Sequence, residues 1–103
     1  MNNQLSLEEK ETLLNVARES LELGLRGEKL PPLNANTPLL QADGATFVTL
    51  TINGKLRGCI GALEPYQPLL QDVREHALAA AQKDYRFSPV RPEELDEIEI
   101  EIS

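Results

Sequence analysis

The dipeptide Asn53-Gly54, set between two apolar stretches, constrains the fold of this 103-residue chain more than any other feature. A two-residue type I′ hairpin turn needs positive φ at both central residues, and Asn-Gly supplies it best. The preceding stretch, 45–52, is rich in β-branched residues and predicts a strand. The following stretch, 55–63, predicts the returning strand of a β-hairpin.

Helices are predicted on both sides of this hairpin. The first covers 7–23, because Ser6 is a good N-cap and Glu9, three residues later, completes a capping box. The second is predicted over 68–83, where apolar residues recur at helical spacing. The connection 27–44 is rich in proline, so we expect leucines to hold it on the core: Leu30, Leu33, Leu39 and Leu40.

The segment 97–103 alternates isoleucine and glutamate, which predicts a half-buried strand. The order helix, hairpin, helix, strand favours an α+β fold, with a mixed or antiparallel sheet packed by two main helices. No internal repeat or linker divides residues 1–103, so we expect a single domain. Aromatic residues make up only 4% of the chain, so its core must be aliphatic.

The net charge of −7 is concentrated near one end of the chain. Residues 93–103 hold six acids and no base, whereas the first 92 residues hold eleven acids and ten bases. No basic stripe is visible, which argues against nucleic-acid binding. No apolar run is long enough to span a bilayer, and the first residues do not resemble a signal peptide. We therefore expect no membrane contact.

The chain has one cysteine, Cys59, and one histidine, His76. One cysteine excludes an intramolecular disulfide, which favours a cytoplasmic setting. Two soft ligands are too few for a zinc site, so we predict no metal centre. No cofactor can be inferred, because dinucleotide and P-loop fingerprints are absent.

The segment 56–61, Leu-Arg-Gly-Cys-Ile-Gly, is the most informative part of the chain. Glycines inside a strand usually mark a bulge or a close backbone approach. In regular alternation Arg57 and Cys59 share one face, and Gly58 lies opposite Thr49 on the neighbouring strand. A guanidinium so placed can stabilise a thiolate, or hold the carboxylate or phosphate of a ligand.

Each residue of this segment has a structural and a functional interpretation. Cys59 is either a small buried hydrophobe or a catalytic thiol. Arg57 either forms a salt bridge, with the glutamates of 97–103 as candidates, or binds an anion. Gly58 and Gly61 either allow a helix to pack closely or leave room for a ligand.

Two further side chains are candidates beyond this segment. Glu64 follows the second hairpin strand, where a carboxylate can reach a cleft and act as a general base. His76 lies in the middle of the second helix, and we expect a partly exposed structural histidine there. The sequence does not show whether the fold brings His76 to Cys59.

The hexapeptide 56–61 resembles the signature of the AMMECR domain family. Further segments resemble the same family in the same order along the chain. These are 47–50, 54–55, 84–89, 94–95 and 98–103.

The resemblance implies an α+β fold of two subdomains with a cleft near the signature. Family members are often encoded with a MEMO-type protein and a radical-SAM protein, in the AmmeMemoRadiSam system, so these are the implied partners. Their activity is not established. Family domains are longer, so we expect this chain to correspond to the N-terminal part and to be incomplete at its C-terminal end.

Two functions follow as hypotheses. The first is a small-ligand or catalytic cleft with Cys59 as its thiol and Arg57, Gly58, Gly61 and Glu64 as binding residues. The second is a non-catalytic module that binds or scaffolds proteins; whether the chain is an enzyme stays open. We also expect weak self-association through the edge of the last strand.

Overall fold

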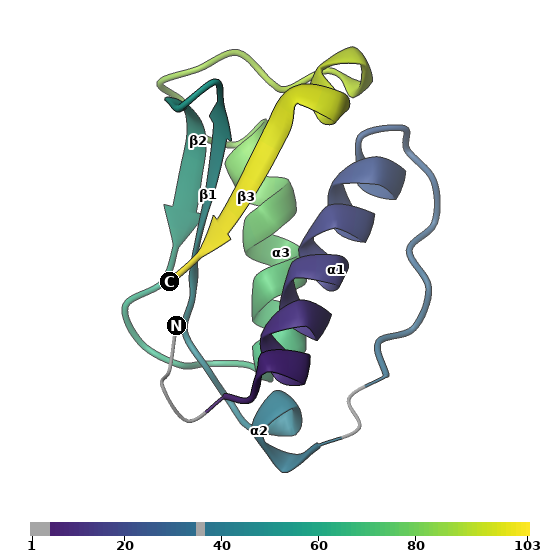
Figure 1. Cartoon of the computed structure of the whole chain (residues 1–103), viewed down its shortest axis with the longest axis vertical. Coiled ribbons are helices and arrows are strands. Elements are labelled where there is room, and N and C mark those ends of the chain that lie inside the picture. Colours follow the sequence, from purple (N-terminus) through teal and green to yellow (C-terminus); the bar gives the residue numbers. More distant parts are fainter. Residues whose placement is uncertain (1–4, 35–36) are drawn as a thin grey trace.

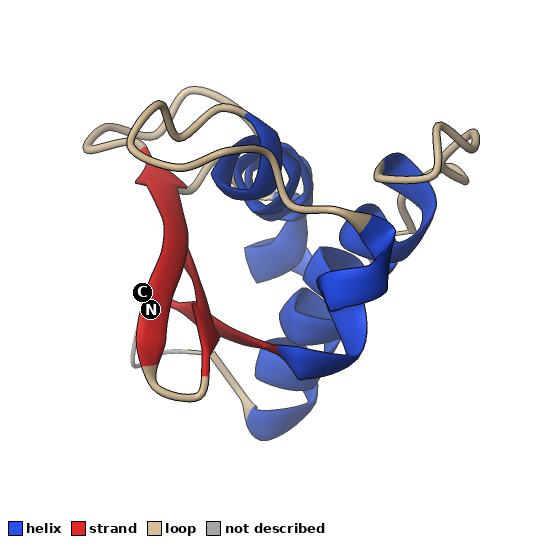
Figure 2. Cartoon of the chain, turned by 90° about the horizontal axis from the view of Figure 1, so that it is seen from above, coloured by secondary structure: helices blue, strands red, loops and turns tan. Residues whose placement is uncertain are grey.

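The computed structural model describes residues 5–34 and 37–103, and it is an α+β fold, as predicted. Three strands form one antiparallel sheet in the order β2-β1-β3. The two long helices, α1 and α3, both cover the same face of this sheet (Figures 1 and 2). The elements are α1 (Leu7–Gly24), α2 (Pro38–Gln41), β1 (Phe47–Ile52), β2 (Lys55–Gly61), α3 (Leu69–Gln82), the 3-10 helix η1 (Pro92–Glu97) and β3 (Ile98–Ile102).

Helix α1 begins with the predicted capping box. The Glu9 N–H donates to Ser6 Oγ at 3.1 Å, and the Ser6 N–H donates to Glu9 Oε1 at 2.9 Å. The bond from the Ser6 N–H is also the main reason why the pKa of Glu9 is lowered. The helix ends at Gly24, one residue later than predicted.

The connection between α1 and β1 contains the short helix α2. Leu40 is fully buried, and Leu33 and Leu39 pack against the core, as predicted. Leu30 is half-buried and lines a groove along α3. No helix among the described residues is long and apolar enough to cross a membrane.

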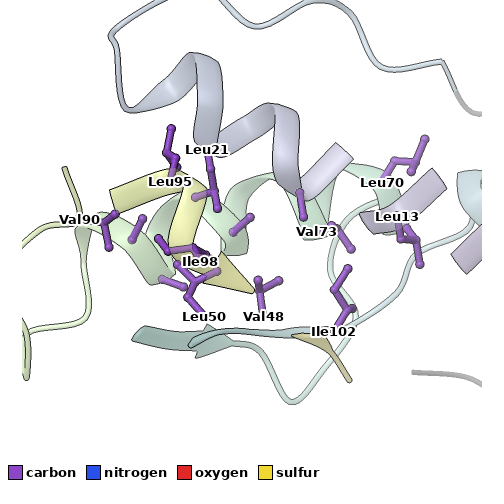
Figure 3. Packing of buried hydrophobic residues seen from close by; sticks show 14 of the residues in the cluster. Leu13, Leu21, Val48, Leu50, Leu70, Val73, Val90, Leu95, Ile98 and Ile102 are labelled. Atoms are coloured by element: carbon purple, nitrogen blue, oxygen red, sulfur yellow. The ribbon is translucent and has the colours of Figure 1, made fainter. Parts of the chain in front are cut away.

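The core lies between the sheet and the helices and is made of aliphatic side chains (Figure 3). Val48 and Leu50 of β1 point toward the helices and are fully buried. Because side chains alternate along a strand, Thr49 and its outward neighbours lie on the other face. We call that other face the outer face of the sheet.

The hairpin turn forms where predicted, since Asn53 and Gly54 have φ of 52° and 78°. The strands are shorter than the predicted 45–52 and 55–63. Beside the turn the register is as expected, with Ile52 opposite Lys55.

A β-bulge then shifts the register between Leu50 and Thr51. Gly58 pairs with Leu50, and Cys59 pairs with Thr49. The prediction that Gly58 lies opposite Thr49 is therefore wrong, because Arg57 is an extra residue in β2. The physical reason is that the bulge turns Gly58 toward α3.

Gly58 is buried against the backbone of α3. A Cβ atom at this position would overlap the carbonyl oxygen of Ala80, which belongs to the helix backbone and cannot rotate away. Helix α3 buries Val73, Ala77 and Ala80. It also buries His76, which is 7% exposed, so the expected partial exposure of that side chain is wrong.

The last strand begins at Ile98, because Glu97 still belongs to η1. Ile98 and Ile102 are buried and the glutamates between them are exposed, as the alternation predicts. The guanidinium of Arg18 on α1 donates to the carbonyl oxygens of Leu95 and Ile98, at 3.1 and 2.7 Å. These bonds fix the start of β3 to α1.

We expect Gly58→Ala to destabilise the protein by about 1–3 kcal/mol, because the new methyl group collides with backbone. Gly24→Ala is a matched control, since there the methyl group meets only the movable tip of Leu78. Denaturant unfolding of both variants measures the difference. Equal stability of the two variants would contradict the close contact between β2 and α3.

We also expect weak self-association through β3, which pairs on one side only within the described chain. Ile100 and Ile102 turn their backbone N–H and C=O groups toward the open edge, because Phe47 and Ser103 exchange hydrogen bonds. Glu99 and Glu101 oppose pairing by repulsion, so salt should strengthen it. Sedimentation at low and high salt tests this; a strict monomer in both would contradict it.

Candidate functional site

Cys59 lies on the outer face of the sheet, away from the helices. Its thiol is partly exposed, and Sγ lies 3.2 Å from the Oγ1 of Thr49, within hydrogen-bond distance. In the described part of the chain no helix covers this face (Figure 2). The thiol is therefore accessible from a side where the fold leaves room for a second molecule or segment.

The backbone of Cys59 is held by Asp84, from the loop after α3. The Cys59 N–H donates to Asp84 Oδ2 at 3.0 Å. Arg86 donates to the same carboxylate from Nε and Nη2, at 3.0 and 2.7 Å. These bonds, with that of Arg86 foremost, hold the pKa of Asp84 far below its usual range.

Arg86 is linked to Cys59 through Asp84, which accepts hydrogen bonds from both residues. Its pKa is raised, first by the hydrogen bond and the charge of Asp84 and, more weakly, by its interaction with Cys59. Half of its side chain remains exposed. Arg86, and not Arg57, is thus the guanidinium tied to the Cys59 backbone, whereas Arg57 is directed toward the segment 88–94.

Arg57 fastens the segment 88–94 to the edge of β2. Its Nε and Nη2 donate to the two carboxylate oxygens of Glu94, at 3.0 and 3.1 Å. Its Nη1 and Nη2 also donate to the carbonyl oxygens of Ser88 and Pro89. The Arg57 guanidinium is the main reason why the pKa of Glu94 is lowered.

These contacts correct two sequence expectations. Arg57 does form a salt bridge, but its partner is Glu94 of η1 and not the glutamates of 97–103. Its hydrogen bonds lead away from Cys59, because the bulge removes the regular alternation that would place both on one face. The anion-binding role proposed for Arg57 therefore has to compete with four existing hydrogen bonds.

The other predicted binding residues are spread along the end of β2. Gly61 is packed against Thr46 and Phe47, with no room for a Cβ atom. Glu64 is exposed and lies three residues beyond the strand. Neither residue lines any of the four main cavities of the described chain, nor do Arg57 and Cys59. A ligand cleft around these residues stays a prediction.

His76 belongs to a different part of the molecule. Its Nδ1 lies 3.1 Å from Asp72 Oδ2, and the ring borders a groove along α3. Because α3 covers the inner face of the sheet, the imidazole and the Cys59 thiol lie on opposite sides. The fold does not form a Cys–His pair from these two residues.

Sequence reasoning did not identify Asp84, Arg86 or Glu94 as partners of the hexapeptide. The segment 84–89 was noticed only through its family resemblance. An Asp-x-Arg pattern just after a helix was the available signal, since the two side chains can form a local ion pair. The spacing along the chain did not indicate that Asp84 also accepts from Cys59 on β2. The described residues contain no cluster of acids, histidine and cysteine able to hold a metal ion.

A three-stranded antiparallel sheet with helices on one face defines an α+β domain. Residues 14–103 match the AMMECR1 family, and the chain belongs to that family.

Similar proteins come from archaea. One protein of Methanothermobacter thermautotrophicus is 46% identical over 100 residues, covering 96% of this chain and 52% of its own. A protein of Methanopyrus kandleri is 43% identical over 110 residues, covering 100% of this chain and 51% of its own. The crystal structure of an uncharacterised protein from Pyrococcus horikoshii matches with a TM-score of 0.82 and 35% identity, over 90% of this chain and 49% of that one. The chain thus spans about half the length of these relatives.

The Asp84 pair predicts a specific loss of stability in acid. A carboxyl whose pKa is lowered by folding stabilises the fold above its unfolded pKa, about 4, and loses this contribution as pH falls toward the folded value. We expect Asp84→Asn to be less stable than the parent at neutral pH, and the gap to narrow below about pH 4. Asp96→Asn, which changes an exposed carboxyl, is the control. A gap that does not change with pH would contradict the ionic role of Asp84.

Proposed function

We propose that this domain is a non-catalytic binding module whose outer sheet face receives a protein partner. The single observation that carries the proposal is the position of the Cys59 thiol. It lies on an open face beside Thr49, while the imidazole of His76 lies on the other side of the sheet. The thiol is thus presented for contact without the base that a thiol nucleophile usually needs.

The rest of the hexapeptide supports a scaffolding role. Arg57 fastens the segment 88–94, and Gly58 allows contact with α3. Ile60 packs against the core, and Gly61 lets the ring of Phe47 lie over the strand. Each of these contacts positions β2, so the signature is explained without a reaction.

The outer face also carries apolar surface. Phe47 and Leu56 are 36% and 42% exposed. Phe47 pairs with Gly61, and Leu56 pairs with Thr51. By the alternation along β1, both leave their side chains on the outer face. Apolar side chains left exposed on one face of a domain can mark a protein-interaction site. Here they share the outer face with Thr49 and Cys59.

The proposed partner is the MEMO-type protein that the family resemblance implies, in a cytoplasmic setting. The radical-SAM protein of the same system is the second candidate partner. Since the relatives are about twice as long, the remainder of such a protein could contribute to the same face. The surface proposed here is the part that this chain supplies.

Alkylation of the single cysteine tests the proposal. We expect a purified MEMO-type protein, at saturating concentration, to slow the reaction of Cys59 with iodoacetamide by at least about tenfold, because the interface excludes the reagent. Leu56→Asp should weaken this protection, since it places a charge in the apolar surface. Leu63→Asp changes a leucine that is 88% exposed beyond β2 and should leave the protection intact.

Two outcomes would overturn the proposal. One is unchanged alkylation in the presence of the partner, and the other is an equal effect of Leu56→Asp and Leu63→Asp. The catalytic alternative is tested without a partner, because His76→Asn should then leave the alkylation rate unchanged within about twofold. A drop of tenfold or more would restore a thiol–imidazole pair and favour an enzyme.

A further inference from the structure

The groove along α3 is the largest of the four main cavities, with a volume of about 650 Å³. Most of its wall comes from α3, and the remainder comes from Leu30, Ile60, Tyr66 and Lys83, the residue that follows α3. It lies on the helix side of the sheet and does not include Cys59. The proposed function therefore makes no use of it.

A buried carboxylate, Asp72, stands behind this groove. It is fully buried and accepts hydrogen bonds from the Thr46 N–H and Oγ1, at 2.8 and 2.7 Å, and from Gln67 Nε2 at 3.0 Å. The N–H groups among these partners can only donate, and they occupy both carboxylate oxygens. The remaining contact of Oδ2 is with His76 Nδ1 at 3.1 Å.

This network determines which nitrogen of His76 carries the proton. Nδ1 faces an acceptor, so it must donate its hydrogen to Asp72. In the neutral ring Nε2 is then an unprotonated acceptor. Nε2 has no hydrogen-bond partner among the described residues. Every fully buried side-chain nitrogen or oxygen there has a partner, so Nε2 is not fully buried and reaches the groove surface.

The surroundings of His76 indicate what kind of molecule fits. The ring of Tyr66 meets the imidazole edge-on at 6.5 Å, and Ile60, Leu78 and Ala79 add apolar wall. Lys83 is the C-cap of α3, seven residues beyond His76 and about 10 Å from it along the helix axis, and it lines the same groove. Lys83 forms no ion pair with any described residue.

The other charged groups of the rim are already engaged. Arg74 donates to the carbonyl oxygen of Pro31, and Glu75 accepts from the amide of Gln71. Arg74 keeps its charge, since its acceptor is a neutral carbonyl, but this bond directs it toward Pro31, so Lys83 is the rim cation without a partner among the described residues. The groove offers an acceptor at one end, apolar wall in the middle and a cation at the other end.

We propose that this groove is a second binding site, for an elongated organic acid that carries a hydroxyl or amino donor. The donor binds Nε2 of His76, the body of the molecule lies against Ile60, Leu78 and Ala79, and the carboxylate faces Lys83. Asp72 is a positioning residue, because it fixes the ring and its proton without touching the ligand.

The chain has one histidine, so imidazole nitrogen NMR reports on this site alone. We expect the Nδ1–H tautomer in the parent protein. Asp72→Ala should let the Nε2–H tautomer appear, because the acceptor that holds the proton on Nδ1 is then gone. A merely structural role of Asp72 would not move the proton. The Nε2–H tautomer in the parent protein would overturn the proposal.

The binding probe is 3-(4-hydroxyphenyl)propionate, followed through the His76 resonances. Its methyl ether lacks the donor and 4-ethylphenol lacks the carboxylate, so we expect both to bind about three- to tenfold more weakly, the loss typical of one hydrogen bond or ion pair. Equal binding of the three compounds, or no shift with the hydroxy acid, would overturn the proposal.

Three variants complete the experiment. His76→Asn keeps a donor for Asp72 but lacks Nε2. Lys83→Gln removes the cation at an exposed position. If the buried His76→Asn variant fails to fold, the Lys83→Gln variant still tests the site. Each should weaken the hydroxy acid about three- to tenfold. Cys59→Ser should change neither the tautomer nor the affinity. If Cys59→Ser lost affinity for the hydroxy acid, the groove and the outer face would not be independent sites. If instead no protein partner protected Cys59, only the proposed function would fail, and the binding experiment in the groove would keep its meaning.

Discussion

The contact between Gly58 and the carbonyl of Ala80 is the constraint on which the rest of the structure depends. Strand β2 can approach α3 this closely only where a side chain is absent, and the bulge at Arg57 turns the glycine toward the helix. The same bulge turns Cys59 outward beside Thr49. It also frees the Arg57 side chain to reach the segment after α3. One backbone contact thus determines the orientation of the whole signature.

The secondary structure of this chain was predictable because its signals are local. The Ser6–Glu9 capping box, the Asn53-Gly54 turn and the alternating isoleucines of β3 each act within a few residues, and all three form as predicted. The fold class followed from their order. Three of the four leucines expected to hold the α1–β1 connection, Leu33, Leu39 and Leu40, pack on the core, because an apolar segment beside a sheet tends to bury its side chains.

The candidate site was less predictable because it depends on contacts between distant segments. A bulge adds one residue to a strand, and no local signal distinguished it from the regular register of β2. The partners of Arg57 and Cys59 are supplied by Glu94 and Asp84, which lie 37 and 25 residues away. His76 was expected to be partly exposed, because a helix pattern does not reveal that Asp72, Thr46 and Gln67 form a buried polar network.

The two edges of the sheet, β2 and β3, differ in how far their backbone hydrogen-bonding groups are covered by the rest of the chain. Along β2 the Cys59 N–H donates to Asp84, and the Arg57 side chain holds the segment 88–94 beside the strand, so the chain itself covers part of that edge. Along β3, among the described residues, Arg18 occupies the carbonyl of Ile98, and the outward backbone groups of Ile100 and Ile102 have no partner. A fourth strand is therefore received more readily beside β3, where it would extend the sheet toward α1.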